Sequence, residues 1–150
     1  MGGGDSVALV EKSVLVGYPA ERMYGLVDDV ERYPEFLPWC GGTEVESRDV
    51  TSTRAAILID YHGIKQSFKT ENRTQPPERI EIRLVSGPFH RLDGMWQFTP
   101  LSSQACKIDF RLHYEFSNRL LEKLVGPVFK HIANTLLDAF LRRAEQLYRT

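Results

Sequence analysis

Cysteines and long apolar runs are scarce in this sequence, and each shortage excludes a class of protein. The 150 residues include only two cysteines, Cys40 and Cys106, whose separation fits neither a metal-ligand motif nor a disulfide framework, so a reducing compartment is expected. No apolar run approaches the roughly 18 residues that indicate a membrane-spanning helix. No signal peptide or arginine-rich transit segment is visible, which favours a bacterial cytoplasm, with peripheral contact to the inner membrane as an option.

Excess charge and catalytic spacing are also missing. Nineteen lysines and arginines face twenty acidic residues, and the net charge of −1 argues against bulk nucleic-acid binding while leaving room for a local basic patch. The four histidines are scattered, without an HExxH pattern or paired ligand spacing, so no metal site is expected. Asp60 is more typical of a solvent-facing strand end than of a buried base, and Cys40 of a small buried hydrophobe than of a reactive thiol. We therefore expect a protein without enzymatic activity.

What is present indicates one folded domain. With 42% hydrophobic and 26% charged residues, the composition is that of an ordinary globular protein. The length suits a single domain with a sizeable core. We assign this domain to residues 7–150, after a glycine-rich flexible leader at residues 1–6.

Helical periodicity marks both ends of the chain. After a strand at Val7–Val16, the run Tyr18-Pro19-Ala20-Glu21 opens a helix, and a second short helix is expected within Glu31–Cys40. Near the C-terminus, apolar residues from Leu121 to Leu147 recur every three or four positions. Because Gly126-Pro127 should break a helix, we predict a short helix over Asn118–Val125 and a long one from Pro127 onward.

The middle of the chain has a period of two, which predicts antiparallel strands joined by short turns. The expected strands are Thr43–Arg48, Ser52–Tyr61, Gln66–Gln75, Arg79–Val85, Arg91–Pro100 and Ala105–Phe116. Alternation is clearest in the last, where Cys106, Ile108, Phe110, Leu112, Tyr114 and Phe116 share one face. It is weakest in Gln66–Gln75, whose apolar content is essentially Phe68, so that strand should lie near an edge or face a wet space.

This order predicts an α+β fold: a curved antiparallel sheet of about seven strands wrapped on a long C-terminal helix, with two short helices after the first strand. One helix cannot fill the concave side of such a sheet, so we expect a gap closed at one end by the short helix with Trp39. Ligand pockets typically enclose about 300–1,000 Å³. The aromatic wall could equally pack solid.

Several motifs resemble one known family. They are Tyr18-Pro19-Ala20-Glu21 with Met23-Tyr24, Tyr33-Pro34-Glu35-Phe36-Leu37-Pro38-Trp39-Cys40, Gly87-Pro88-Phe89, Leu92, Gly94, Trp96-Gln97-Phe98, Asn118, Gly126 and Val128-Phe129. The chain is similar, from about Ala8 to Tyr148, to START and Bet v1-like proteins of helix-grip fold. The closest likeness is to the polyketide-cyclase-type branch, which contains coenzyme Q-binding START proteins and bacterial ribosome-association toxins.

The resemblance implies three alternative functions. The first is binding or transport of a hydrophobic small molecule such as ubiquinone or another lipid in support of respiration, with no required cofactor. The second is inhibition of ribosome association by binding to the large ribosomal subunit. The third is a polyketide aromatase/cyclase. The first is our leading expectation, because an apolar tunnel gains about 25 cal/mol per Å² of buried apolar surface and needs no catalytic residue.

Two sets of candidate residues follow. The expected ligand-binding residues are Tyr33, Phe36, Leu37, Trp39, Phe68, Phe89, Trp96, Phe98, Tyr114, Phe129, Ile132, Leu136 and Phe140. The possible RNA contacts are Arg119, Lys123, Lys130, Arg142 and Arg143, which could instead serve only solubility. The hydroxyls of Tyr33 and Tyr114 could anchor a ligand or bond the backbone. Phe36, Leu37 and Trp39 together suggest an exposed rim for transient contact with a membrane surface.

Overall fold

The computed structural model describes residues 7–149, so the expected leader at residues 1–6 lies outside the described part of the chain. The elements are β1 (Val7–Val16), α1 (Ala20–Asp28), the 3-10 helix η2 (Val30–Arg32), α2 (Tyr33–Phe36), β2 (Cys40–Arg48), β3 (Ser52–Tyr61), β4 (Ile64–Gln75), β5 (Arg79–Ser86), β6 (Phe89–Ser102), β7 (Ala105–Phe116) and α3 (Arg119–Tyr148). All seven expected strands are present, and their order is that of the helix-grip α+β fold.

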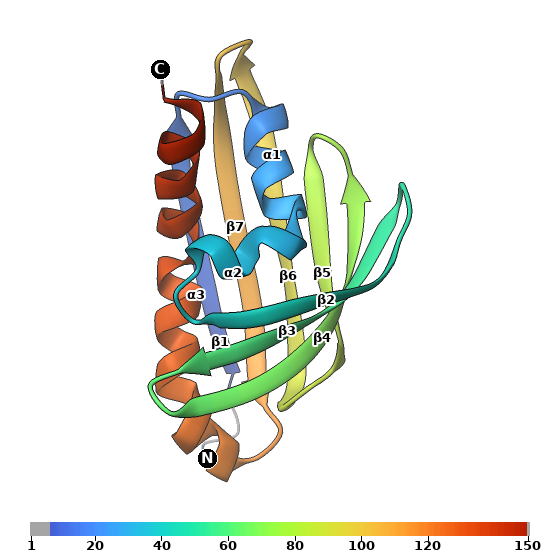
Figure 1. Ribbon diagram of the computed structural model, residues 1–150, viewed down its shortest axis with the longest axis vertical. Helices are drawn as coiled ribbons and strands as arrows, with labels where there is room; N and C mark the ends of the chain where they lie inside the picture. Colours follow the sequence, from blue (N-terminus) through green and yellow to red (C-terminus); the bar gives the residue numbers. More distant parts are fainter. Residues whose placement is uncertain (1–6, 150) are drawn as a thin grey trace.

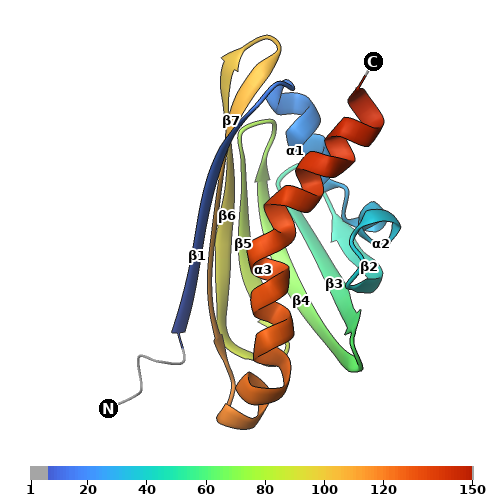
Figure 2. The ribbon, with the colours of Figure 1, turned by 90° about the vertical axis from the view of Figure 1, so that its left-hand side faces the viewer.

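The seven strands form one antiparallel sheet in the order β1-β7-β6-β5-β4-β3-β2. The chain therefore runs as a meander from β2 to β7, and only β1 joins out of sequence, beside β7. The sheet curves round α3, which crosses one of its faces (Figure 1). The view turned by 90° shows α3 in front of the sheet, between the edge strands β1 and β2 (Figure 2). The inner face, toward α3, is therefore where a core can form.

Strand β7 shows how the sequence builds this core. Its inward residues, Cys106 through Phe116 in steps of two, are all buried, whereas Lys107 and Arg111 between them are exposed. The expected alternation is confirmed. A half-buried strand of period two places its apolar side chains against the helix and its charged ones in water.

The C-terminal helix differs from its prediction. Helix α3 runs without interruption from Arg119 to Tyr148, with Pro127 inside it, so the expected break at Gly126-Pro127 is wrong. Pro127 lies on the exposed side, where water can satisfy the carbonyl group that loses its N–H partner. The helix begins at Asn118, whose side-chain Oδ1 accepts a hydrogen bond from the N–H of Leu121 at 2.9 Å.

Strand β4 lies in the interior of the sheet, between β3 and β5, so the first of its two expected positions, near an edge, is wrong. Its weak apolar pattern has another cause. The residues that follow Phe68 on the inward side are Thr70, Asn72 and Thr74, and both threonines are buried. A fully paired interior strand thus presents polar side chains to the core.

The segment after α1 is less helical than expected. Helix α2 ends at Phe36, so Trp39 lies in the connection to β2 rather than in the capping helix. Trp39 is held by pairing of the backbone: its carbonyl oxygen accepts a hydrogen bond from the N–H of Asp60 at 2.9 Å. The bend between β5 and β6 requires Gly87, which has φ of +147° and whose absent Cβ would lie 2.6 Å from the Cβ of Phe68.

Candidate functional site

Aromatic rings fill the space between the sheet and α3 in two groups. One group, which we call the Phe89 cluster, comprises Phe68, Phe89, Tyr114, Phe116 and Phe129. The ring centroid of Phe89 lies 4.9 Å from those of both Phe116 and Phe129. The second group surrounds Trp96, whose ring lies 4.4 Å from Phe110 and 5.4 Å from Phe140. Both groups combine sheet residues with α3 residues, so packing of the helix fixes both.

A cavity of about 80 Å³ lies between these groups. Its wall is formed by Val30, Tyr33, Trp39, Ala55, Ile57, Phe68, Thr70, Asn72, Ile82, Leu92, Trp96, Phe110, Leu112, Phe129, Ile132, Ala133, Leu136 and Phe140. The expected gap between sheet and helix is present, but its volume is well below the roughly 300–1,000 Å³ of a typical ligand pocket. Bulky rings from both layers occupy most of the space that the curved sheet leaves.

The cavity gathers eight of the thirteen residues expected to bind a ligand. Those on its wall are Tyr33, Trp39, Phe68, Trp96, Phe129, Ile132, Leu136 and Phe140. The other five do not line it. Phe89 and Tyr114 belong to the Phe89 cluster, Leu37 and Phe98 are buried in the core, and Phe36 packs on Phe140 at the edge of a surface groove.

Ten wall residues were absent from the sequence-based set, and two of them, Thr70 and Asn72, have polar side chains. The signal that could have identified them is the weak alternation of β4, because a polar residue at an inward position must face a polar partner or a cavity. The Oδ1 atom of Asn72 is buried and accepts no hydrogen bond from residues 7–149. Asn72 is therefore the polar group that the cavity offers.

The two tyrosines considered as anchors differ from Asn72. The hydroxyl of Tyr33 donates a hydrogen bond to the backbone carbonyl of Val27, so this group is already occupied. Complete burial, followed by the nearby Asp28 carboxylate, raises the pKa of Tyr33. Burial also raises the pKa of Tyr114, which lies in the Phe89 cluster. Both phenols therefore stay protonated at neutral pH.

The expected membrane-facing rim is not exposed. Leu37 is 1% and Trp39 is 6% accessible, so neither can meet a lipid surface in this conformation. Phe36 is partly covered by Arg143, whose guanidinium carbon lies 5.1 Å from the ring centre. Arg143 also pairs with Glu35 at 2.9 Å. These contacts tie α2 to α3 and leave a surface groove of about 400 Å³ beside Trp39 and Tyr61.

The side chains considered as reactive groups, Cys40 and Asp60, lie in environments typical of structural residues. Cys40 and Cys106 are free and buried, and burial raises the pKa of both thiols, which keeps them in the unreactive protonated form. Asp60 is exposed and lies 4.0 Å from the ammonium nitrogen of Lys65. Residues 7–149 contain no group of three histidine, cysteine or carboxylate side chains arranged to hold a metal ion. No helix in that range is long and apolar enough to cross a membrane.

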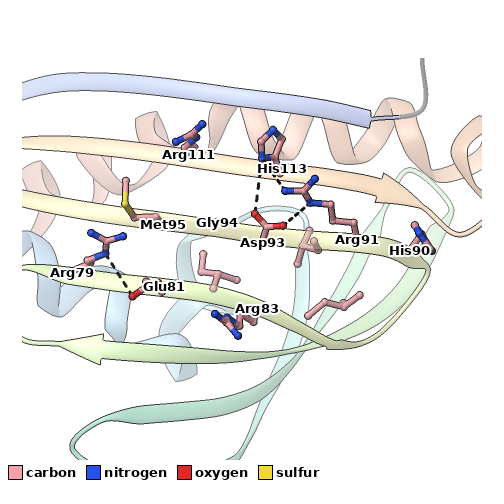
Figure 3. Close-up of a pocket in the computed structure, with 13 residues that line it drawn as sticks. Arg79, Glu81, Arg83, His90, Arg91, Asp93, Gly94, Met95, Arg111 and His113 are labelled. Atoms are coloured by element: carbon pink, nitrogen blue, oxygen red, sulfur yellow. Dashed lines mark hydrogen bonds and ion pairs between the residues drawn. The ribbon is translucent and has the colours of Figure 1, made fainter. Parts of the chain in front are cut away.

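A larger groove, of about 790 Å³, lies on the outer face of the sheet (Figure 3). It forms because β5 and β6 pair only from Arg79 to Arg83, after which the two strands separate. Its cations are largely neutralised: Arg91 bonds Asp93 at 2.7 Å, Arg79 lies 3.7 Å from Glu81, and Arg111 lies 3.6 Å from Glu11. Cations and carboxylates are therefore mixed in this groove, and it is not a basic patch.

Besides Arg83 of this groove, unpaired cations occur on α3. Arg119, Lys123 and Lys130 are exposed and form no ion pair within residues 7–149. With about 100° of rotation per residue, they lie within about 40° of one another around the helix. Arg142 is also exposed but lies about 120° away from Lys130, and Arg143 is 17% accessible and paired. The five expected RNA contacts therefore do not share one face.

Comparison with known proteins identifies the family of this chain. The sequence model of the polyketide cyclase / dehydrase and lipid transport family matches residues 16–141. The chain belongs to this family. It is similar to a protein of Pseudomonas aeruginosa named ribosome association toxin RatA, with 42% identity over 139 residues that cover 93% of this chain and 96% of the relative.

Other proteins that are similar to this chain have different names. The coenzyme Q-binding protein COQ10 homolog B, mitochondrial, of Xenopus laevis is 28% identical over 141 residues, which cover 91% of this chain and 58% of that protein. The crystal structure of the Zhui aromatase/cyclase of Streptomyces sp. R1128 superposes with a TM-score of 0.79 at 18% identity, covering 96% of this chain and 97% of the other. At that identity the likeness shows the shared fold alone.

Proposed function

We propose that this protein associates with the ribosome, as the name of its RatA relatives states for those proteins, and that it contacts the large subunit. The observation that supports this most is the 42% identity with RatA over nearly the full length of both chains. The relative with a coenzyme Q-binding name is more distant and is only partly covered by the alignment. This ranks ribosome association above the ligand carrier, and a ribosomal partner implies a bacterial cytoplasm.

The surface that supports this role is the start of α3. Arg119, Lys123 and Lys130 follow one line of the helix, and the exposed side chains of Leu120 and Leu124 lie beside them. Cations without carboxylate partners can replace the counterions of RNA phosphates, and this gives binding its salt dependence. Exposed leucines add apolar area that a partner can cover. In the groove on the outer face of the sheet, by contrast, Arg91 and Arg111 are paired with carboxylates.

Sedimentation with purified ribosomal subunits tests the proposal. The double variant Lys123→Glu/Lys130→Glu should lose at least about ten-fold in affinity for the large subunit, and its affinity should depend less steeply on salt. The control is Lys65→Glu/Lys107→Glu, which makes the same change of charge at exposed positions on the sheet. Failure of the wild type to bind either subunit would refute ribosome association. Equal loss in both double variants would refute α3 as the contact surface.

The cavity supports a second candidate function, binding of a hydrophobic molecule. Its wall is aromatic and aliphatic, it is enclosed between sheet and helix, and Asn72 supplies a polar group. Ubiquinone is the first candidate by resemblance to the coenzyme Q-binding proteins. At about 80 Å³ the cavity would have to widen to admit a quinone ring. This role and ribosome association use different surfaces and can coexist.

A further inference from the structure

The inner face of β4 contributes two polar side chains to a mostly apolar cavity wall. Thr70 and Asn72 line the cavity, and Thr74 follows on the same side of the strand. Thr74 is already engaged, since its hydroxyl donates to the carbonyl of Val50 at 3.3 Å. On the opposite side of the cavity, Tyr33 is engaged with Val27. Among the wall residues, Asn72 is the one with a buried polar atom that has no hydrogen-bond partner within residues 7–149.

Pairing of the strand holds Asn72 in place. Its backbone is paired on both sides, with Thr53 of β3 and Ile82 of β5, so the side chain cannot leave the inner face without disrupting the sheet. The Oδ1 atom is buried without a protein partner. Another buried oxygen without a partner, the hydroxyl of Tyr24, belongs to α1 and does not line the cavity. A buried polar atom without a hydrogen-bond partner lowers the stability of the fold, which points to a function for the Asn72 side chain.

The surroundings of Asn72 indicate what would bind there. A side-chain amide offers an acceptor oxygen and a donor nitrogen, and a hydroxyl group can serve either one. The rest of the wall carries flat rings, those of Phe68, Trp96, Phe110 and Phe140 among them. Rings of this kind favour an aromatic ligand through stacked and edge-to-face contacts.

We propose that Asn72 is the hydrogen-bonding residue of the cavity and that it selects an aromatic ring bearing a hydroxyl group over the same ring with an acceptor alone. A phenol or a reduced hydroquinone meets this requirement. A quinone or an aryl ether does not, because neither can donate a hydrogen bond to Oδ1. This inference rests on the second candidate function, ligand binding in the cavity, and is independent of ribosome association.

The cavity must widen for such a ring. An engineered protein cavity of about 150 Å³ admits benzene, roughly twice the volume available between these side chains. Three aliphatic residues of the wall, Ile57, Ile82 and Leu136, are partly exposed. Rotation of their side chains can enlarge the cavity toward the surface. Weak affinity for a small probe, in the millimolar range, is therefore expected.

Three probes of similar size isolate the hydrogen bond: phenol, anisole and toluene. Binding is followed by NMR of the methyl groups of Ile57, Ile82, Ile132 and Leu136, all on the cavity wall. Phenol should bind the wild type about ten-fold more tightly than anisole or toluene, the effect of one buried hydrogen bond. In Asn72→Leu the three affinities should agree within about two-fold, whereas Asn72→Ser, which keeps a hydroxyl, should retain the preference.

Thr53→Val is the matched control, because Thr53 is buried opposite Asn72 on β3 but does not line the cavity. It should keep the preference for phenol. Equal affinity of the wild type for phenol and toluene would overturn the role of Asn72 while leaving ligand binding intact. Absence of binding by all three probes would overturn both. Persistence of the preference in Asn72→Leu would assign the hydrogen bond to another residue and also overturn the proposal. Ribosome sedimentation is read separately.

Discussion

The Phe89 cluster and the cavity lie side by side in one core, share Phe68 and Phe129, and differ in packing. Phe89 meets aromatic rings from β4, β7 and α3 at centroid distances between 4.9 and 6.3 Å. The cavity wall has rings as well, but it also contains Ala55, Ala133, Thr70 and Asn72. Aromatic content therefore does not decide where a core is hollow. Small and polar residues at inward positions do.

The largest expected effect tests the solid half of this comparison. Phe89→Ala should lower the free energy of unfolding by about 3–5 kcal/mol, because the removed ring leaves a void that its neighbours cannot fill. Leu136→Ala, on the cavity wall and already partly exposed, should cost less than about 2 kcal/mol. Urea unfolding of both variants measures the difference. Similar losses would show that the two regions are equally well packed.

Two alanines of α3 sharpen the comparison by the opposite change. Ala133 lines the cavity and Ala144 does not, although both are buried in the same helix. Ala144→Val should cost about 1–3 kcal/mol from overpacking. Ala133→Val, which grows into the cavity, should cost less than about 1 kcal/mol or stabilise the protein. The lower helix propensity of valine affects both variants alike and cancels in the difference. Thermal unfolding that ranks the two in reverse would contradict the position of the cavity.

The smallest expected effect concerns the hydroxyl group of Tyr33 on the cavity wall. Tyr33→Phe removes the hydrogen bond to the Val27 carbonyl and should cost about 1–2 kcal/mol, since that buried acceptor loses its partner. The affinity for phenol should not change, because the Tyr33 hydroxyl is turned to the backbone. Tyr61→Phe, at a partly exposed position, is the control and should change stability by less than about 0.5 kcal/mol. Weaker phenol binding in Tyr33→Phe would make Tyr33 a ligand anchor after all.

Most of the fold could be predicted from the sequence because its elements have strong local patterns. Strands β1, β3 and β7 have the predicted bounds, and the alternation in β7 identifies its buried face. The same holds for the long apolar stripe of α3. Part of the candidate site was also predicted, because Trp96, Phe129 and Phe140 were among the expected ligand-binding residues and line the cavity. Periodicity reveals which face of an element is buried, and this information is contained in short stretches of sequence.

The volume and polarity of the cavity could not be predicted in this way. They depend on how far rings from separate elements interpenetrate, and the spacing of residues along one element carries no such information. Leu37 and Trp39 illustrate the point: their sequence suggested an exposed rim, and packing of the connection to β2 buried both. Arg143 likewise reads as a surface cation, yet it is paired with Glu35, which lies 108 residues away in the chain.

The sequence by itself determined the order of the strands and helices, the buried faces with the clearest periodicity, and the family, since each is encoded in local pattern or motif. Tertiary structure decided the rest. It allowed α3 to continue past Pro127, because the exposed side of the helix tolerates a missing hydrogen bond while the opposite side packs against the core. It placed β4 between two partners and thereby turned Asn72 toward the cavity. These outcomes depend on contacts between residues far apart in the chain, and local sequence does not specify such contacts.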